Sequence, residues 1–367
     1  MDRNELDSIN ERVTDRSEVF YWQTDRKITL DEAAGIWKDR HKPFDDAQII
    51  RCVNDVLEND KLLELDKFDP NSQTSLGSVN HVRVGRLSSG KTVIVRCHPK
   101  GVINGYFHVE SLASETARKE GLPSYGTYAV HDLKGGDNFS FQVCEKLPGT
   151  AMSKWLETRP EDERTLLYCV GRAMALVHRI KVEGFGPFDN DSAKTGKLIG
   201  LHGNFESAVK AGLSSNLEVL KGYGIFSHAE AEATIETFEK ERKLMHCSAP
   251  VLVHNDFADW NLLTDGKAIT GILDWDECVG SDPISDIACW STFFKPERLA
   301  HMLEGYWSVA GKPPDFDRKF ELLRFRYTIS KMTLRTRRYT YQPTDFVKAT
   351  IDAGKEHLRK SMDYFGI

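Results

Sequence analysis

The sequence predicts an α+β protein in which a small β-rich N-lobe is followed by a larger helical C-lobe. Short segments that alternate apolar and polar residues dominate up to residue 148, and segments of helical periodicity dominate after it. With 367 residues, the chain is long enough for two lobes. We expect a helical appendage over residues 1–42, the N-lobe over 43–148 and the helical C-lobe over 149–367.

The N-lobe is predicted from local patterns. Its expected elements, in order, are a helix over 29–37 that opens on a capping box, a helix over 45–57, strands over 62–68, 81–87 and 92–95, a helix over 106–120, and strands over 126–130 and 139–144. A Ser88-Ser89-Gly90 turn separates the second and third strands, so we expect a small antiparallel sheet.

The C-lobe is predicted to be mainly helical. Its expected helices cover 151–156, 161–182, 205–220 and 229–245, with more helices from 287 to the end. The polar, glycine-bearing stretch over 183–203 predicts a loop or an insertion. Two short apolar runs, 251–253 and 269–273, predict strands that interrupt the helices.

Composition and charge exclude several classes of protein. The net charge of −6 gives no global basic field, so we expect no nucleic-acid partner. No run of about 18 apolar residues occurs, and the polar N-terminus has no apolar signal segment, so we expect no membrane span and a cytoplasmic location. The seven cysteines show no CxxC spacing, which is typical of reduced thiols in a cytosolic protein.

Three polar residues stand out beside the two apolar runs. Asn261 lies five residues after Asp256, and Asp274 lies eighteen residues after it. Phosphoryl transfer needs a positioned acceptor hydroxyl and neutralised phosphate charge. Asp256 can accept the proton of that hydroxyl, and the oxygens of Asn261 and Asp274 are ligands that Mg²⁺ prefers. The alternative is a chance match without function, in which Asp274 belongs to a surface turn. His254 is expected to have a structural role and to hold the loop.

This stretch resembles a known family. The sequence HNDFADWNLL, followed by ITGILDWDECVGSDPISDIA, is similar to the aminoglycoside phosphotransferase pattern HxDxxxxNxL and a later strand ending in IDW. The likeness covers roughly residues 60–300 and is greatest to the hygromycin B phosphotransferases. It implies a protein-kinase-like bilobal fold, ATP or GTP as donor with Mg²⁺, and a small-molecule hydroxyl as acceptor. It also implies that Asp256 is the catalytic base and that Asn261 and Asp274 bind the metal.

The same resemblance implies that the N-lobe binds the nucleotide. A cation should contact the α- and β-phosphates, and an acid on the next helix should hold that cation in place. Arg96 stands where many family members have lysine, and Lys91 and Lys100 are competitors at strand ends. Glu110 fits the acid best, and Glu115 is the second choice.

Two further segments are expected to contact the nucleotide. The turn Leu76 to Asn80 resembles the family's phosphate-covering loop, so Ser78 and Asn80 are candidates, although an ordinary hairpin turn fits as well. The hinge that contacts the nucleotide base would run through residues 144–147, which include Glu145 and Leu147, and would act through its backbone.

The acceptor site is the least defined part of this interpretation. Candidate substrate-binding residues near the motifs are Asp259, Trp260, Asp276 and Glu277, with Asp282 as a further acid. Acids would suit a polycation such as an aminoglycoside. Against this, residues 318–338 contain eight basic residues and one acid, which indicates either a solvated face or contacts with an anionic group.

The sequence therefore predicts a small-molecule O-phosphotransferase, a kinase that acts on an alcohol group. A hygromycin-like aminoglycoside is the first acceptor considered, which would make the protein an antibiotic-resistance enzyme. The alternative is a metabolic kinase for a sugar, choline or homoserine, and a pseudokinase that only binds is a third hypothesis. The expected partners are a nucleoside triphosphate and a small hydroxylated acceptor, and the chain is expected to be a monomer or a homodimer.

Overall fold

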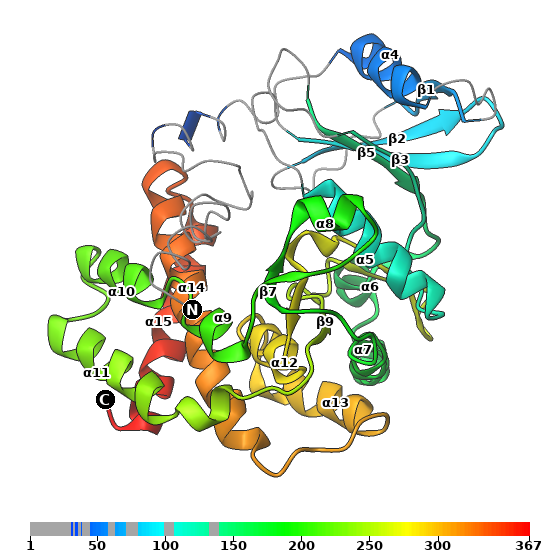
Figure 1. The fold of residues 1–367 in the computed structure, drawn as a ribbon. Coiled ribbons are helices and arrows are strands. Elements are labelled where there is room, and N and C mark those ends of the chain that lie inside the picture. The colour runs from blue at the N-terminus through cyan, green and yellow to red at the C-terminus, as the bar shows by residue number, and fades with distance from the viewer. Residues whose placement is uncertain are drawn as a thin grey trace.

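The structure is a computed structural model, and it describes residues 31, 34, 35, 38, 45–57, 63–70, 80–98, 106–131 and 139–367. Most of the predicted appendage over 1–42, and the part of the phosphate-covering turn that holds Ser78, lie outside the described residues. Within the described residues, a β-sheet forms most of the N-terminal part and helices form most of the C-terminal part (Figure 1). The predicted α+β fold class is confirmed.

A five-stranded antiparallel sheet dominates the N-terminal part. Its strands are β1 (Leu65–Phe68), β2 (His81–Leu87), β3 (Thr92–Cys97), β4 (Thr127–His131) and β5 (Phe141–Glu145), in the order β1-β2-β3-β5-β4. Helix α4 (Asp46–Val56) places Ile49 and Val53 against the buried side chains of this sheet, among them Val93 and Val95. Helix α5 (Phe107–Lys119) instead contributes to the core of the C-terminal part.

Helices make up most of the chain after residue 151. The α-helices are α6 (Met152–Thr158), α7 (Glu163–Val177), α8 (Asn190–Lys194), α9 (Phe205–Lys210), α10 (Leu213–Gly222), α11 (His228–Lys240), α12 (Ile284–Ser291), α13 (Pro296–Trp307), α14 (Phe316–Tyr341) and α15 (Asp345–Phe365). Short 3-10 turns are η1 (Pro160–Asp162), η2 (Arg242–Met245) and η3 (Trp275–Glu277). The predicted helix over 205–220 is wrong in one respect, because Gly212, with φ of 69°, separates α9 from α10.

Two small sheets lie among these helices. One has the order β11-β10-β6 and is formed by β6 (Thr150–Ala151), β10 (Leu262–Thr264) and β11 (Ile269–Ile272). The other has the order β8-β7-β12-β9 and is formed by β7 (Phe185–Phe188), β8 (Gly200–His202), β9 (Val251–Val253) and β12 (Val279–Ser281). Of the two alternatives predicted for 183–203, the loop is wrong, because this stretch contains β7, α8 and β8. The strands in this stretch are short, and β7 pairs with β12, which lies far away in the sequence. The local sequence pattern therefore does not predict this sheet.

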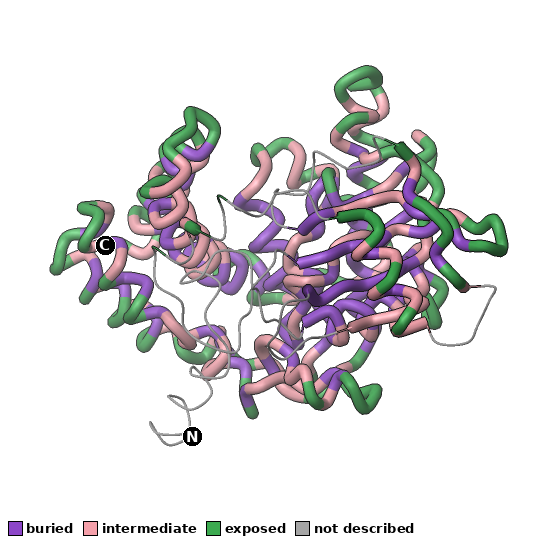
Figure 2. Tube along the Cα trace, turned by 90° about the horizontal axis from the view of Figure 1, so that it is seen from above, coloured by how far each residue is buried: buried purple, intermediate pink, exposed green. Residues whose placement is uncertain are grey.

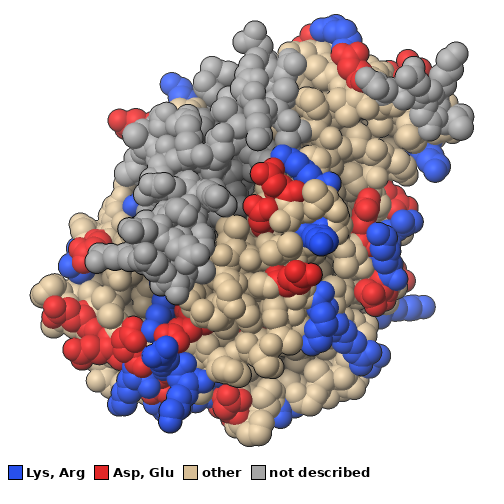
Figure 3. All heavy atoms as spheres, in the orientation of Figure 1, with Lys and Arg blue, Asp and Glu red and all other residues tan. Residues whose placement is uncertain are grey.

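The buried apolar residues form two core clusters, a smaller one in the N-terminal sheet and a larger one mainly in the helical C-terminal part. Figure 2 shows where buried residues lie along the chain. The larger core includes Trp275 and Trp290, which are almost fully buried. All seven cysteines are free, and burial raises the pKa of Cys144 to about 12. On the face shown in Figure 3, basic and acidic side chains are interspersed rather than gathered by sign. Among the described residues, no helix is long and apolar enough to cross a membrane.

Two glycines allow α7 and α13 to approach closely. A Cβ added at Gly171 would lie 1.9 Å from the carbonyl oxygen of Met302, and one added at Gly305 would lie 1.9 Å from that of Tyr168. Because backbone atoms cannot rotate away, Gly171→Ala should lower the free energy of unfolding by about 1–3 kcal/mol in a denaturant titration.

Gly222 provides the matched control, because a Cβ added there meets nothing within 4 Å. Gly222→Ala should change the free energy of unfolding by less than about 0.5 kcal/mol. Equal denaturation midpoints for Gly171→Ala and Gly222→Ala would show that α7 and α13 can move apart without a loss of stability.

Candidate active site

The candidate site is built on the loop that follows β9. The carboxylate of Asp286, on α12, is 0% exposed and accepts the backbone N–H groups of His254 and Asn255, both at 3.0 Å. Asn255 adopts a left-handed conformation with φ of 65°, which L residues rarely adopt. The thiol of Cys289, one turn further along α12, donates to the carbonyl oxygen of Asn255 at 2.9 Å. Helix α12 therefore fixes the strained start of the loop.

His254 connects this loop to the segment that carries Asp274. Its Nε2 lies 2.9 Å from the carbonyl oxygen of Leu273, so Nε2 carries the proton and Nδ1 is left to accept the backbone N–H of Asp256 at 3.3 Å. Burial lowers the pKa of His254, which keeps the ring neutral. The ring also packs 4.6 Å from that of Trp275. His254 thus supports the loop, the role expected from the sequence.

Asp256 and Asn261 face one another across the loop. The Nδ2 of Asn261 donates to the backbone oxygen of Asp256 at 2.9 Å and to its Oδ2 at 2.7 Å. Both hydrogen bonds use the amide nitrogen, so the amide oxygen of Asn261 points elsewhere and can act as a metal ligand. The arrangement brings a carboxylate and a neutral oxygen donor together.

Asp274 follows β11 and begins η3. Its φ is 62°, a second left-handed position, and the turn directs its half-exposed carboxylate toward the N-terminal sheet. There, Nη2 of Arg96, on β3, donates to Oδ1 of Asp274 at 2.6 Å. The ion pair joins two residues 178 positions apart in the sequence and links the two parts of the chain.

Arg96 also pairs with Glu110, which lies on α5 and is 1% exposed. Burial disfavours the charge of Arg96, but the carboxylates of Glu110 and Asp274 outweigh burial and raise its pKa. The pairing expected between a β3 cation and an α5 acid is therefore present. The acid of α5 that pairs with Arg96 is Glu110 and not Glu115. Lys91 directly precedes the first residue of β3, Thr92.

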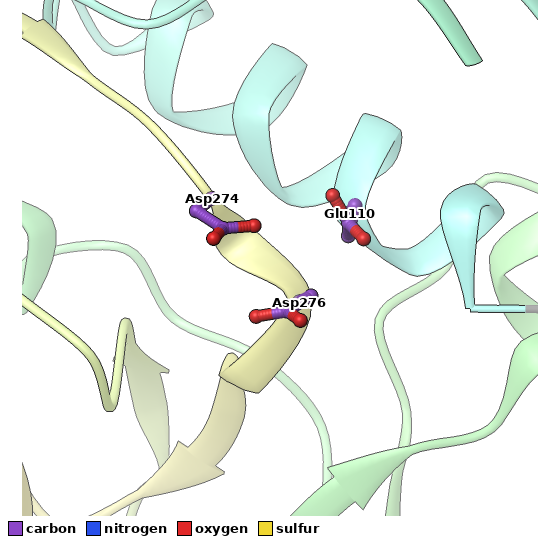
Figure 4. A group of neighbouring side chains, drawn as sticks. All are labelled: Glu110, Asp274 and Asp276. Carbon is purple, nitrogen blue, oxygen red and sulfur yellow. The ribbon is translucent and has the colours of Figure 1, made fainter. Parts of the chain in front are cut away.

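Three carboxylates gather where these elements meet. Oxygens of Glu110, Asp274 and Asp276 lie within 4.8 Å of one another, with Asp274 and Asp276 on one turn and Glu110 on the facing helix (Figure 4). An all-oxygen group of this kind fits a hard cation such as Mg²⁺. The sequence assigned Asp276 to the acceptor, whereas the structure places it beside Asp274. Arg96 pairs with both Glu110 and Asp274, but Glu110 is buried whereas Asp274 and Asp276 are partly exposed, so the two aspartates are the acids that a metal ion can reach.

The remaining nucleotide candidates occupy the N-terminal sheet. Asn80 is buried, and its Oδ1 lies 2.8 Å from Nδ1 of His98. Glu145 ends β5, and its side chain accepts the backbone N–H of Gly126 at 3.3 Å. Leu147 is half-buried and packs against the larger core, in the segment that leads from β5 to β6. Asn80 and Glu145 therefore have local partners, and nucleotide contacts by these residues stay predictions.

The acceptor candidates divide into two groups. Asp259 is buried, and its Oδ2 accepts a 2.6 Å hydrogen bond from Arg298. Trp260 is 44% exposed and lies edge-on against Phe293, at 5.4 Å between ring centroids. Glu277 is half-buried at the end of η3. Asp259 is thus part of an internal ion pair, while Trp260 faces outward next to Asn261.

Sequence reasoning missed several residues that shape the site. Gln142, a polar residue between the apolar residues Phe141 and Val143 of β5, is fully buried and accepts from Arg96 at 3.3 Å, and that break in the pattern was a usable signal. Asp286 was recognised only as part of a motif, without its role in the loop. His178, which lies 3.2 Å from Asp286, and Arg298 carried no local signal.

The support given by Asp286 can be tested by replacing it with asparagine. An asparagine has one acceptor oxygen, and its NH₂ group would face one of the two backbone N–H donors. We expect Asp286→Asn to lower the free energy of unfolding by about 1.5–3 kcal/mol, the contribution of a hydrogen bond to a charged group, and to lower kcat. Asp352→Asn, on the exposed face of α15, should leave both unchanged. Unaltered stability in Asp286→Asn would contradict the proposed support.

The fold and the geometry define a kinase-like phosphotransferase, because phosphoryl transfer depends on positioning and charge neutralisation of this kind. The model of the phosphotransferase enzyme family matches residues 88–321, which is more than half of the chain, and the chain belongs to that family. A comparison with curated protein sequences found no match.

Solved structures show the same fold. The chain is similar to a thermostable mutant of aminoglycoside phosphotransferase APH(4)-Ia in a ternary complex with AMP-PNP and hygromycin B, at 17% identity and a TM-score of 0.57, over 80% of this chain and 94% of that one. It is also similar to a putative fructosamine-3-kinase from Thermobifida fusca, at 16% identity and 0.58, over 85% and 98%. A choline/ethanolamine kinase family protein from Mesorhizobium loti gives 16% and 0.53, over 81% and 88%.

Proposed function

We propose that the protein transfers the γ-phosphate of ATP or GTP to a hydroxyl group of a small molecule. The observation that carries this proposal is the position of Asp256 and Asn261 in one loop, joined through His254 to the segment of Asp274. In the proposed reaction the acceptor oxygen forms a bond to the γ-phosphorus. The bond from that phosphorus to the bridging oxygen breaks, its electrons leave with the nucleoside diphosphate, and the hydroxyl proton passes to Asp256.

On the donor side, Arg96 is proposed to contact the α- and β-phosphates, with Glu110 holding the guanidinium in place. Asp274, Asn261 and Asp276 are proposed to hold Mg²⁺, which would neutralise phosphate charge when bound. The short segment over residues 144–147 is the proposed hinge for the nucleotide base. The nucleotide analogue in the complex of APH(4)-Ia supports this part of the proposal.

On the acceptor side, the first compound to test is hygromycin B, because the sequence resemblance and the APH(4)-Ia complex both point to it. Resistance to such an antibiotic would follow if it is the acceptor. Sugar, choline and homoserine form the alternative class, supported by the fructosamine-3-kinase and choline/ethanolamine kinase neighbours. The proposed state is a soluble cytoplasmic monomer or homodimer.

The test is transfer of labelled γ-phosphate to a panel of hydroxylated compounds, alongside nucleotide binding with and without Mg²⁺. We expect Mg²⁺-dependent binding of ATP or GTP and transfer to at least one acceptor. Mg²⁺-dependent binding without any transfer would favour a pseudokinase. Absence of both would overturn the proposal.

A further inference from the structure

In the basic stretch over 318–338, Lys331 differs from most of its basic neighbours in its contacts. Most of these side chains have partners of their own. The ion pairs and hydrogen bonds are Arg318 to Glu241, Lys319 to Asp282, Arg324 to Glu321, Arg326 to the carbonyl oxygens of Val209 and Ala211, Arg335 to that of Thr350, and Arg338 to Gln342. The contacts of Arg318, Lys319, Arg326 and Arg335 therefore join α14 to other elements, and those of Arg324 and Arg338 are local.

Lys331 makes no hydrogen bond or ion pair with any residue that the structure describes. Its Nζ lies 4.0 Å from the ring centroid of Phe293, and the side chain is half-buried. Burial disfavours the charge of Lys331, but nearby acidic groups, among them Glu277 and Asp256, favour it, and the pKa of Lys331 is raised. The ammonium group thus stays charged next to an aromatic ring, within the electrostatic reach of the proposed catalytic base.

Arg96 and Lys331 are influenced by different acids. The acids that act on Arg96 are Glu110, Asp274 and Asp276, which belong to the proposed nucleotide and metal site. Those that act on Lys331 include Asp256 and Glu277. Of the two cations, Lys331 is therefore the one whose charge is coupled to Asp256, the proposed base toward which an acceptor hydroxyl would be directed.

The acids that could receive a polycation are largely engaged. Asp259 is bound to Arg298, and Asp282 accepts from Lys319, in each case at 2.6 Å. Asp276 lies in the carboxylate group beside Asp274. Lys331 acts on Glu277, another of the acids considered for the acceptor. A polycationic acceptor would meet little uncompensated negative charge here.

An aromatic surface joins Lys331 to the loop. Trp260, which follows Asp256 by four residues, contacts Phe293 edge-on, and Phe293 carries Lys331 over its face. A molecule with its hydroxyl at Asp256 could pack on these rings while an anionic group reached the ammonium.

We infer that the acceptor is a hydroxylated small molecule that carries a carboxylate or a phosphate ester, which Lys331 binds. This inference rests on the proposed function and narrows its acceptor to an anionic compound, in place of an aminoglycoside or choline. Lys331 is a specificity residue in this view, and the protein gains its preference from a single half-buried charge next to Phe293, which contacts Trp260 of the loop that holds Asp256.

The experiment uses the full chain loaded with Mg²⁺ and AMP-PNP, and acceptors in matched pairs. Titration calorimetry would compare glycerate and glycerol 3-phosphate with glycerol, and pantothenate with pantothenol, with hygromycin B as the polycation. The first two acids distinguish a carboxylate from a phosphate ester. We expect at least one acid to bind roughly 10–100-fold more tightly than its neutral partner, the range for a hydrogen bond to a charged group.

Variants of Lys331 assign that preference to the ammonium group. Lys331→Met keeps the length of the side chain and should remove the preference, whereas Lys331→Arg should retain most of it. Lys348→Met removes an exposed charge from α15 and should leave the preference unchanged. Nucleotide affinity, measured in the same samples, reports that each variant is folded.

The outcomes separate the two proposals. The proposed function itself is contradicted if the wild-type protein neither binds nucleotide in a Mg²⁺-dependent manner nor transfers the γ-phosphate. If nucleotide binds normally but no acid binds better than its neutral partner, the anionic acceptor is rejected alone. Tighter binding of hygromycin B, or a preference that survives in Lys331→Met, would reject it equally.

Discussion

Replacing Asp256 by asparagine is expected to lower kcat by roughly 10²–10⁴-fold, the contribution of a general base, while nucleotide affinity is retained. The substitution keeps the size of the side chain and leaves an oxygen that can still accept from Nδ2 of Asn261, so the loop should keep its shape. It removes the group that accepts the hydroxyl proton. The check is steady-state transfer to whichever acceptor the panel identifies, with nucleotide binding measured separately.

Asp352→Asn is the matched control for this variant, because it makes the same chemical change on an exposed helix face. It should behave as wild type in both measurements. If Asp256→Asn retained full turnover, Asp256 could not be the base, whatever the loop geometry suggests.

Replacing Asp274 by asparagine is expected to have a different effect, because it removes a charged metal ligand rather than a proton acceptor. Affinity for the Mg²⁺–nucleotide complex should fall by at least roughly 10–100-fold, since loss of even an outer-shell partner of a metal site typically costs that much. Turnover should fall with it. Nucleotide binding without Mg²⁺ should change far less.

The two variants together separate the roles. Asp256→Asn should keep the dependence of nucleotide binding on Mg²⁺, and Asp274→Asn should lose it. Binding titrations of each protein with and without Mg²⁺ provide the comparison. The same Mg²⁺ dependence in both variants would mean that the metal is held elsewhere.

Much of this organisation could be predicted because it is encoded locally. The strands of the N-terminal sheet follow from alternation and turn residues, and the spacing of Asp256, Asn261 and Asp274 shows directly in the sequence. The pairing of Arg96 with Glu110 could be expected because the family resemblance implies a cation on the third strand and an acid on the next helix.

Other features depend on contacts between distant residues, for which a single sequence has no pattern. The sequence shows acids near the motifs, but it does not show that Arg298 neutralises Asp259 or that Asp276 joins Asp274. It also shows a basic helix without showing that Lys331 differs from its neighbours. Long-range partners decide whether a charge is available, and those partners are visible only in the fold.

The ion pair between Arg96 and Asp274 has a consequence for the sequence of events in the reaction cycle. Before nucleotide arrives, the guanidinium occupies an oxygen of the carboxylate that Mg²⁺ would need. A metal ion entering alone must compete with that cation, whereas a metal–nucleotide complex offers Arg96 phosphate oxygens in exchange. Binding is therefore expected to be ordered, with Mg²⁺ entering together with the nucleotide rather than before it.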